Sequence, residues 1–189
     1  MKFALIVAIW LVAAIVIGAS GALEGLRPPE PQIIIAGLTL ALLIAWRMSE
    51  AFKRFLQVLD LRLLVALHLT RFVGFYFLVL CRRNELPCNF AAPAGWGDVL
   101  VATLAAVLLI SWNVTAGNRV WIGAWNTLGL IDILFVVANA ASHAMRNPSS
   151  MVAFLYLPLS LLPTFLVPLI IATHIFIFSR LRKQRGAGS

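Results

Sequence analysis

Two histidines and an arginine are among the ionisable side chains inside the long apolar stretches of this 189-residue chain. His68 and Arg71 lie three residues apart in one stretch, and His174 lies in another near the C-terminus. An ionisable group within a bilayer is costly unless it is paired or faces a cavity, so each one marks a candidate functional site. We therefore expect a polar site in the apolar interior of the protein.

The two histidines are predicted to lie at the same depth. His68 follows Arg62 by six residues, and His174 precedes Arg180 by six residues. At ~1.5 Å per residue, each imidazole lies roughly 9 Å along its helix from the flanking arginine. Such a pair suits haem b with two histidine ligands and Arg71 on a propionate, or a transition metal completed by a carboxylate. The leading hypothesis is a haem or metal site for electron transfer or other redox chemistry.

A second polar set follows one face of a predicted helix between residues 120 and 141. Its members recur every three or four residues, which places them on one helix face. Gly129 lets another helix approach beside Asp132. We expect Arg71 and Asp132 to form an ion pair, either structural or functional. The stripe comprises Trp125, Gly129, Asp132, Val136, Asn139 and His143.

Each of these residues also has a structural interpretation. A buried histidine is often a hydrogen-bonded packing residue, and Thr173 stands beside His174. Asp98, at the predicted outer end of a helix, is expected to cap that helix. Cys81 and Cys88 fall in a predicted outer loop, where a disulfide and two separate thiols both remain open, because spacing alone does not fix disulfide geometry.

Six apolar segments are predicted to carry these residues. The chain is 62% hydrophobic and only 12% charged, against roughly 25% charged in ordinary soluble domains. We therefore predict an all-α, polytopic transmembrane helix bundle forming a single domain over residues 1–189. Three prolines should kink or partly unwind the last segment. The segments are 3–18, 33–46, 55–80, 99–112, 120–141 and 152–178.

The basic residues predict the orientation of the bundle. With about six spans and both termini inside, ten Lys and Arg side chains fall on the inner side and four on the outer side, the bias expected of a cytoplasmic face. The prediction includes an outer loop over residues 81–98 and a basic cytoplasmic tail over residues 180–189. The net charge of +8 is thus assigned to orientation in a lipid bilayer, and we expect no nucleic-acid partner.

Four stretches together resemble a family of small, uncharacterised bacterial multi-spanning inner-membrane proteins with no assigned activity. They are residues 68–71 (HLTR), 86–99 (LPCNFAAPAGWGDV), 125–138 (WNTLGLIDILFVVA) and 163–181 (PTFLVPLIIATHIFIFSRL). The resemblance implies a bacterial inner-membrane location but no reaction. It directs attention to His68, Arg71, Asp98, Asn126, Asp132 and His174.

Two other functions remain open beside redox chemistry, and the sequence does not decide whether the protein is an enzyme. A small-solute or proton-coupled transporter fits the proline-broken last segment and the buried charges. A chain of this length would then work as a homo-oligomer. In a non-catalytic subunit of a larger membrane complex, the polar residues Asp98, Asn126, Asp132 and Asn139 would instead hold helices together.

Overall fold

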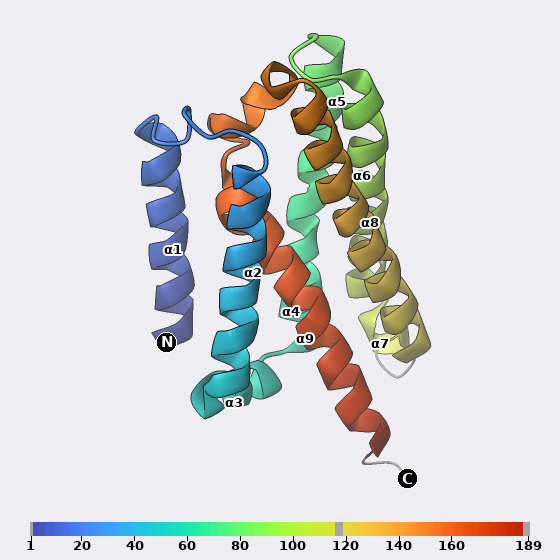
Figure 1. Cartoon of the computed structure of the whole chain (residues 1–189). Coiled ribbons are helices and arrows are strands. Elements are labelled where there is room, and N and C mark those ends of the chain that lie inside the picture. The colour runs from blue at the N-terminus through green and yellow to red at the C-terminus, as the bar shows by residue number, and fades with distance from the viewer. Residues whose placement is uncertain (1, 116–118, 187–189) are drawn as a thin grey trace.

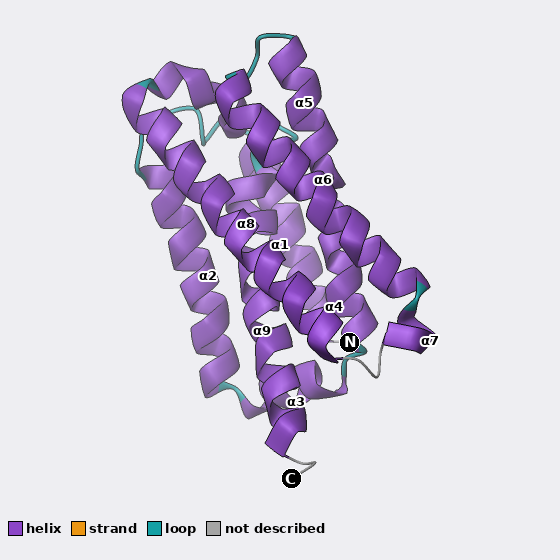
Figure 2. Cartoon of the chain, turned by 90° about the vertical axis from the view of Figure 1, so that its right-hand side faces the viewer, coloured by secondary structure: helices purple, strands orange, loops and turns teal. Residues whose placement is uncertain are grey.

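The computed structural model describes residues 2–115 and 119–186, which are helical and contain no strand. The helices run up and down along a common direction to form one bundle (Figures 1 and 2). Their order is α1 (Lys2–Ala19), α2 (Glu30–Met48), α3 (Glu50–Val58), α4 (Leu61–Leu67), η1 (His68–Val73), α5 (Gly74–Arg82), α6 (Cys88–Ile110), α7 (Trp112–Thr115), α8 (Arg119–Arg146), η2 (Pro148–Leu155), η3 (Leu162–Leu166) and α9 (Val167–Gly186).

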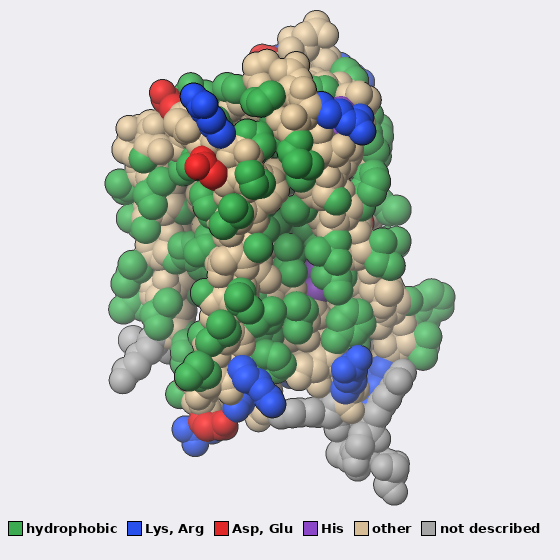
Figure 3. All heavy atoms as spheres, viewed as in Figure 1, with side chains coloured by type: hydrophobic (Ala, Val, Ile, Leu, Met, Phe, Trp, Pro, Cys, Tyr) green, Lys and Arg blue, Asp and Glu red, His purple; other side chains and the backbone are tan. Residues whose placement is uncertain are grey.

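Five helical stretches of the described chain are long and apolar enough to cross a membrane, and the apolar part of α1, Phe3–Ala19, is shorter. Both chain ends lie at the same end of the bundle (Figure 1). On the face in Figure 3, hydrophobic side chains fill the middle band and charged side chains gather toward the two ends. The all-helical prediction is confirmed. The stretches in question are Glu30–Met48, Leu61–Arg82, Cys88–Ile110, Arg119–Arg146 and Leu162–Arg182.

The segment predicted as one helix over residues 55–80 is divided among four elements, α3, α4, η1 and α5. Helix α3 ends at Val58, and α4 begins after Asp60, whose carboxylate accepts a hydrogen bond of 2.9 Å from the Arg62 N–H. Asp60 is therefore an exposed helix cap. The chain then tightens into the 3₁₀ helix η1 at His68 before α5 begins at Gly74. The tighter turn carries both His68 and Arg71 into the interior.

The outer loop predicted over residues 81–98 is mostly helix. Helix α6 begins at Cys88 and includes Pro93 without ending there. Only residues 83–87 separate α5 from α6, and a disulfide joins Cys81 to Cys88, with their Cα atoms 4.8 Å apart. The small residues of this run are interface residues: a Cβ on Gly95 would lie 2.7 Å from the Gly74 carbonyl oxygen. The two helix backbones thus touch, which requires glycine at this crossing.

The last predicted span is broken, as its prolines indicated. A 3₁₀ helix, η2, leads through a turn region into the π-helical segment η3, and regular α-helix begins only at Val167. Helix α1 packs against this broken region: the Trp10 indole N–H donates a 3.0 Å hydrogen bond to the Thr164 carbonyl, and its ring meets Phe165 edge-on. The side chain thus satisfies a carbonyl of the irregular backbone.

Candidate functional site in the bundle interior

Arg71 is the centre of a buried ionic cluster. Its Nε donates to Asp98 at 2.6 Å, and one terminal nitrogen pairs with Asp132. The other terminal nitrogen donates to the Gly129 carbonyl at 2.9 Å. The predicted Arg71–Asp132 pair is confirmed. The side chain of Arg71 is 1% exposed, that of Asp98 5% and that of Asp132 15%, so the cluster is nearly sealed.

Asp98 takes a role different from the predicted one. It does not cap a helix: it lies in the middle of α6, where its carboxylate pairs with Arg71. The cluster therefore draws on three elements, η1, α6 and α8. Gly97 clears the space next to Asp98, because a Cβ there would collide with the Asp132 carboxylate. A larger residue at Gly97 would push Asp132 away from Arg71.

The two histidines lie at the same depth, as predicted, and their rings are in contact. His68 from η1 and His174 from α9 are both fully buried, and their ring centroids are 4.2 Å apart. The indole of Trp125 meets the His68 ring edge-on at 5.0 Å and also borders His174. Gly129 provides the room: a Cβ there would lie 2.6 Å from Cε1 of His174. The pair is thus packed tightly against α8.

Hydrogen bonds fix the tautomers of both imidazoles. The Thr173 hydroxyl donates to the Ile170 carbonyl at 2.8 Å, so toward His68 it accepts, from Nε2–H at 3.3 Å. The Asn126 amide donates to the His174 carbonyl at 3.0 Å, and its oxygen accepts from Nδ1–H of His174 at 2.8 Å. This leaves His68 Nδ1 and His174 Nε2 as lone-pair nitrogens. Both are buried and without a hydrogen-bond partner among the described residues.

This geometry does not suit a haem held between the two rings. Axial imidazoles bind haem iron from opposite sides of the macrocycle, whereas these rings are in direct contact with centroids 4.2 Å apart. The donor set for a metal ion is also small. In residues 2–115 and 119–186, no three His, Cys, Asp or Glu side chains are grouped to hold a metal. A metal at this site would have two protein nitrogens as ligands.

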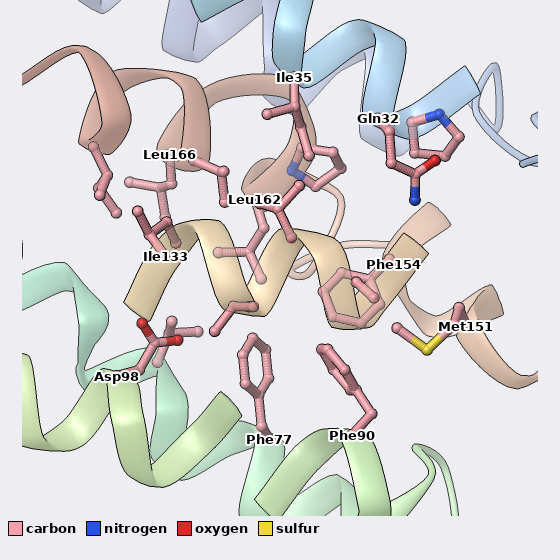
Figure 4. A pocket seen from close by; sticks show the side chains of 18 of the residues that line it. Gln32, Ile35, Phe77, Phe90, Asp98, Ile133, Met151, Phe154, Leu162 and Leu166 are labelled. Atoms are coloured by element: carbon pink, nitrogen blue, oxygen red, sulfur yellow. The ribbon is translucent and has the colours of Figure 1, made fainter. Parts of the chain in front are cut away.

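An apolar cavity of about 90 Å³ adjoins the ionic cluster. Arg71 and Asp98 line one part of it, Gln32 of α2 lines another, and most of the remaining wall is aliphatic or aromatic. Figure 4 shows Asp98 at one side of the cavity and Gln32 across it. The irregular elements η1, η2 and η3 all contribute to the wall. The cavity thus runs from the ionic cluster toward the end of the bundle opposite the chain termini.

The remaining predicted residues lie outside this cluster. Asn139 and His143 are half-buried on α8, and His143 meets the Phe90 ring at 6.0 Å. No pattern in the sequence indicates the cavity wall formed by Phe77, Phe90 and Phe154. The side chains of Asn126 and Thr173 orient the two histidines, a role that their positions in the sequence do not indicate.

Comparison with known families assigns the chain. Residues 28–182 match the family described as Domain of unknown function (DUF8737). The chain belongs to this family. No curated protein and no solved structure matches it. The match contains the ionic cluster, the histidine pair and the cavity, and it begins after α1. The expectation of a family without an assigned activity is thus confirmed.

Proposed function

We propose that this protein is a proton-coupled carrier of a small solute in a membrane, with both chain ends on the cytoplasmic side. The observation that carries the proposal is the sharing of one guanidinium, Arg71, by two carboxylates at the wall of an apolar cavity. The five membrane-length helical stretches and the charged ends of the bundle support the location.

The charge of the cluster supports proton coupling. With Arg71 protonated and both carboxylates ionised, the cluster carries one net negative charge. An uncompensated charge in a low-dielectric interior is costly, so binding of one proton or one cation is favourable there. The site is thus suited to alternate between two neutral states, one holding a proton and the other holding a cationic group.

The irregular helices support movement around this site. The cavity wall includes the 3₁₀ helices η1 and η2 and the π-helical η3. Discontinuous helices commonly form transporter substrate sites near the middle of the membrane. On the other side of the ionic cluster, the packed histidine pair closes the path toward the chain termini. This arrangement corresponds to a carrier whose site is reached from the outer side, and a chain of this size would function as a homo-oligomer.

Proton flux in proteoliposomes tests this function. Vesicles containing a pH-sensitive dye are challenged with small organic cations, anions and zwitterions in turn. At least one class should change the internal pH, and Asp132→Asn should abolish that change. Asp60→Asn is the matched control, because it removes an exposed carboxylate and asparagine still caps helix α4. Folded protein that moves no protons with any of the three classes rules out a carrier.

A metal site at the histidine pair is the second candidate function. The observation that favours it is the pair of unpartnered, buried nitrogens, His68 Nδ1 and His174 Nε2. Imidazole nitrogens are good ligands for zinc, copper, iron and nickel. Elemental analysis of purified protein should then give one such metal per chain, lost in His174→Leu. A metal-free protein that also fails to bind added copper or zinc excludes this candidate.

A further inference from the structure

Three phenylalanines form one wall of the cavity and contact one another. The ring centroids of Phe77 and Phe90 are 6.0 Å apart, those of Phe77 and Phe154 5.8 Å, and those of Phe90 and Phe154 5.7 Å. They come from α5, α6 and η2, so three separate parts of the chain converge on one place. Figure 4 shows Phe77 and Phe90 side by side, with Phe154 above them and Asp98 to the left of Phe77.

Only one of the two carboxylate oxygens of Asp98 accepts a hydrogen bond from the described residues. Oδ1 of Asp98 accepts the hydrogen bond from Arg71 Nε at 2.6 Å, and Oδ2 receives no hydrogen bond from the described residues. The residue as a whole is 3% exposed and lines the cavity. A carboxylate oxygen that has no donor and belongs to a buried residue at an apolar cavity favours a positively charged partner. It equally disfavours an anionic ligand.

We propose that the cavity binds a small organic ammonium ion, with its charged nitrogen near the Phe77–Phe90–Phe154 cluster and Asp98 as its counter-ion. The assignment rests on the proposed function and names the substrate class of the same site. Aromatic faces attract quaternary ammonium groups through their ring quadrupoles, and the attraction grows where water is excluded. The cluster's net negative charge supplies the longer-range part of the attraction.

Size limits the ligand to a small headgroup. The cavity of about 90 Å³ is smaller than an engineered cavity of ~150 Å³ that holds benzene. A compact group such as trimethylammonium matches this scale better than an extended aromatic cation. The bound ammonium ion neutralises the net negative charge of the cluster and thus takes the place of the bound proton. Loading the cation therefore releases one proton, and the carrier exchanges one ammonium ion for one proton.

Choline is the probe for this site, and its neutral carbon isostere is the control. In the isostere a quaternary carbon replaces the nitrogen, so shape is retained and charge is lost. Equilibrium binding to detergent-purified protein should detect choline and not the isostere. Choline affinity should rise with pH, by up to about tenfold per unit while a bound proton must leave.

Two variants separate the carboxylate from the aromatic wall. Asp98→Asn should remove choline binding, and Phe154→Leu, at a half-buried position, should weaken it roughly two- to fivefold. Phe75→Leu is the matched control, because Phe75 is 49% exposed and is not part of the cavity wall. Phe154→Leu keeps the test decisive even where Asp98→Asn does not fold.

Equal binding of choline and the isostere would show a purely apolar cavity and overturn the assignment. So would proton flux that responds to anions or zwitterions and not to choline, and in that case the carrier function itself stands. Choline binding that competes with protons but never drives flux would retain the ammonium site and remove the carrier function.

Discussion

Helix α2 and the stretch Leu162–Arg182 have similar hydropathy, but α2 is mostly exposed and Leu162–Arg182 is mostly buried. Their mean hydropathies are 1.6 and 2.0, yet 6% of the α2 window is buried against 72% of the other. In a water-soluble protein, comparable hydropathy would place both inside. Here the buried stretch is distinguished by polar residues, His174, Thr173 and Thr164, and α2 exposes large apolar side chains such as Ile33 and Leu40.

The difference shows what selects the interior in a bundle of this kind. Where the surroundings are apolar, burying leucine or isoleucine gives little advantage, and polar groups that find partners determine which face points inward. The interior face of α9 contacts η1 and α8 through hydrogen bonds of His174 and Thr173. Substitutions should therefore have large effects in the polar interior and small effects on the apolar exterior.

Arg71→Met should have the largest effect. It leaves Asp98 and Asp132 buried without a cation, and breaking a buried ion pair costs about 3–5 kcal/mol. The free energy of unfolding is measured by titration with a denaturing detergent. Arg82→Met, at the exposed end of α5, should change it by less than about 0.5 kcal/mol. An equal effect of the two substitutions would contradict the importance assigned to the ionic cluster.

Asn126→Ala should cause the second-largest loss of stability. It removes the acceptor of His174 Nδ1–H and the donor to the His174 carbonyl, and each buried polar group left unpaired costs about 1–3 kcal/mol. The same detergent titration measures the loss. Asn139→Ala, on the same helix, is the control, because Asn139 is half-buried and its side chain makes no hydrogen bond within the described residues. A smaller loss at Asn126 than at Asn139 would contradict the polar interior.

Glycine-to-alanine substitutions should lower the stability of the protein in the polar interior and raise it on the exposed helix α2. Gly129→Ala places a Cβ 2.6 Å from His174 Cε1 and 3.1 Å from Val101 Cγ1, and such overpacking costs about 1–3 kcal/mol. Gly37→Ala on α2 meets nothing within 4 Å and should stabilise the helix by up to about 1 kcal/mol. Thermal unfolding of both variants measures the difference. Destabilisation by Gly37→Ala would reveal a partner packed on α2.

Periodicity and depth predicted the main part of the candidate site. The stripe through Asp132 and the position of Arg71 predicted their pairing, and equal distance from flanking arginines predicted that His68 and His174 lie at the same depth. These predictions succeed because helical rise and repeat are fixed by backbone geometry. The proline-rich last segment was also correctly expected to be broken.

The prediction failed where small residues form an interface. Pro93, Gly95 and Gly97 predict a loop, which places Asp98 at a helix end and gives no indication of its pairing with Arg71. Propensity favoured that reading, but close backbone packing against Gly74 outweighs it. A repeat of alanine and glycine at helical spacing was the available signal: Ala91, Ala94, Gly95, Ala102 and Ala105 are all buried on one side of α6. The cavity and its aromatic wall are formed by elements that are far apart in the sequence, so no local sequence pattern predicts them.

The bond between Cys81 and Cys88 bears on the proposed orientation of the bundle in a membrane. Disulfides persist in oxidising compartments and are rare in the cytosol. The bridge closes the turn at the end of the bundle opposite the chain termini. The disulfide thus supports the proposed orientation, in which that end lies on the oxidising side and the chain ends lie in the cytosol. The support from this pair of sulfur atoms comes from redox chemistry, and it is independent of the arginine and lysine distribution on which the predicted orientation rests.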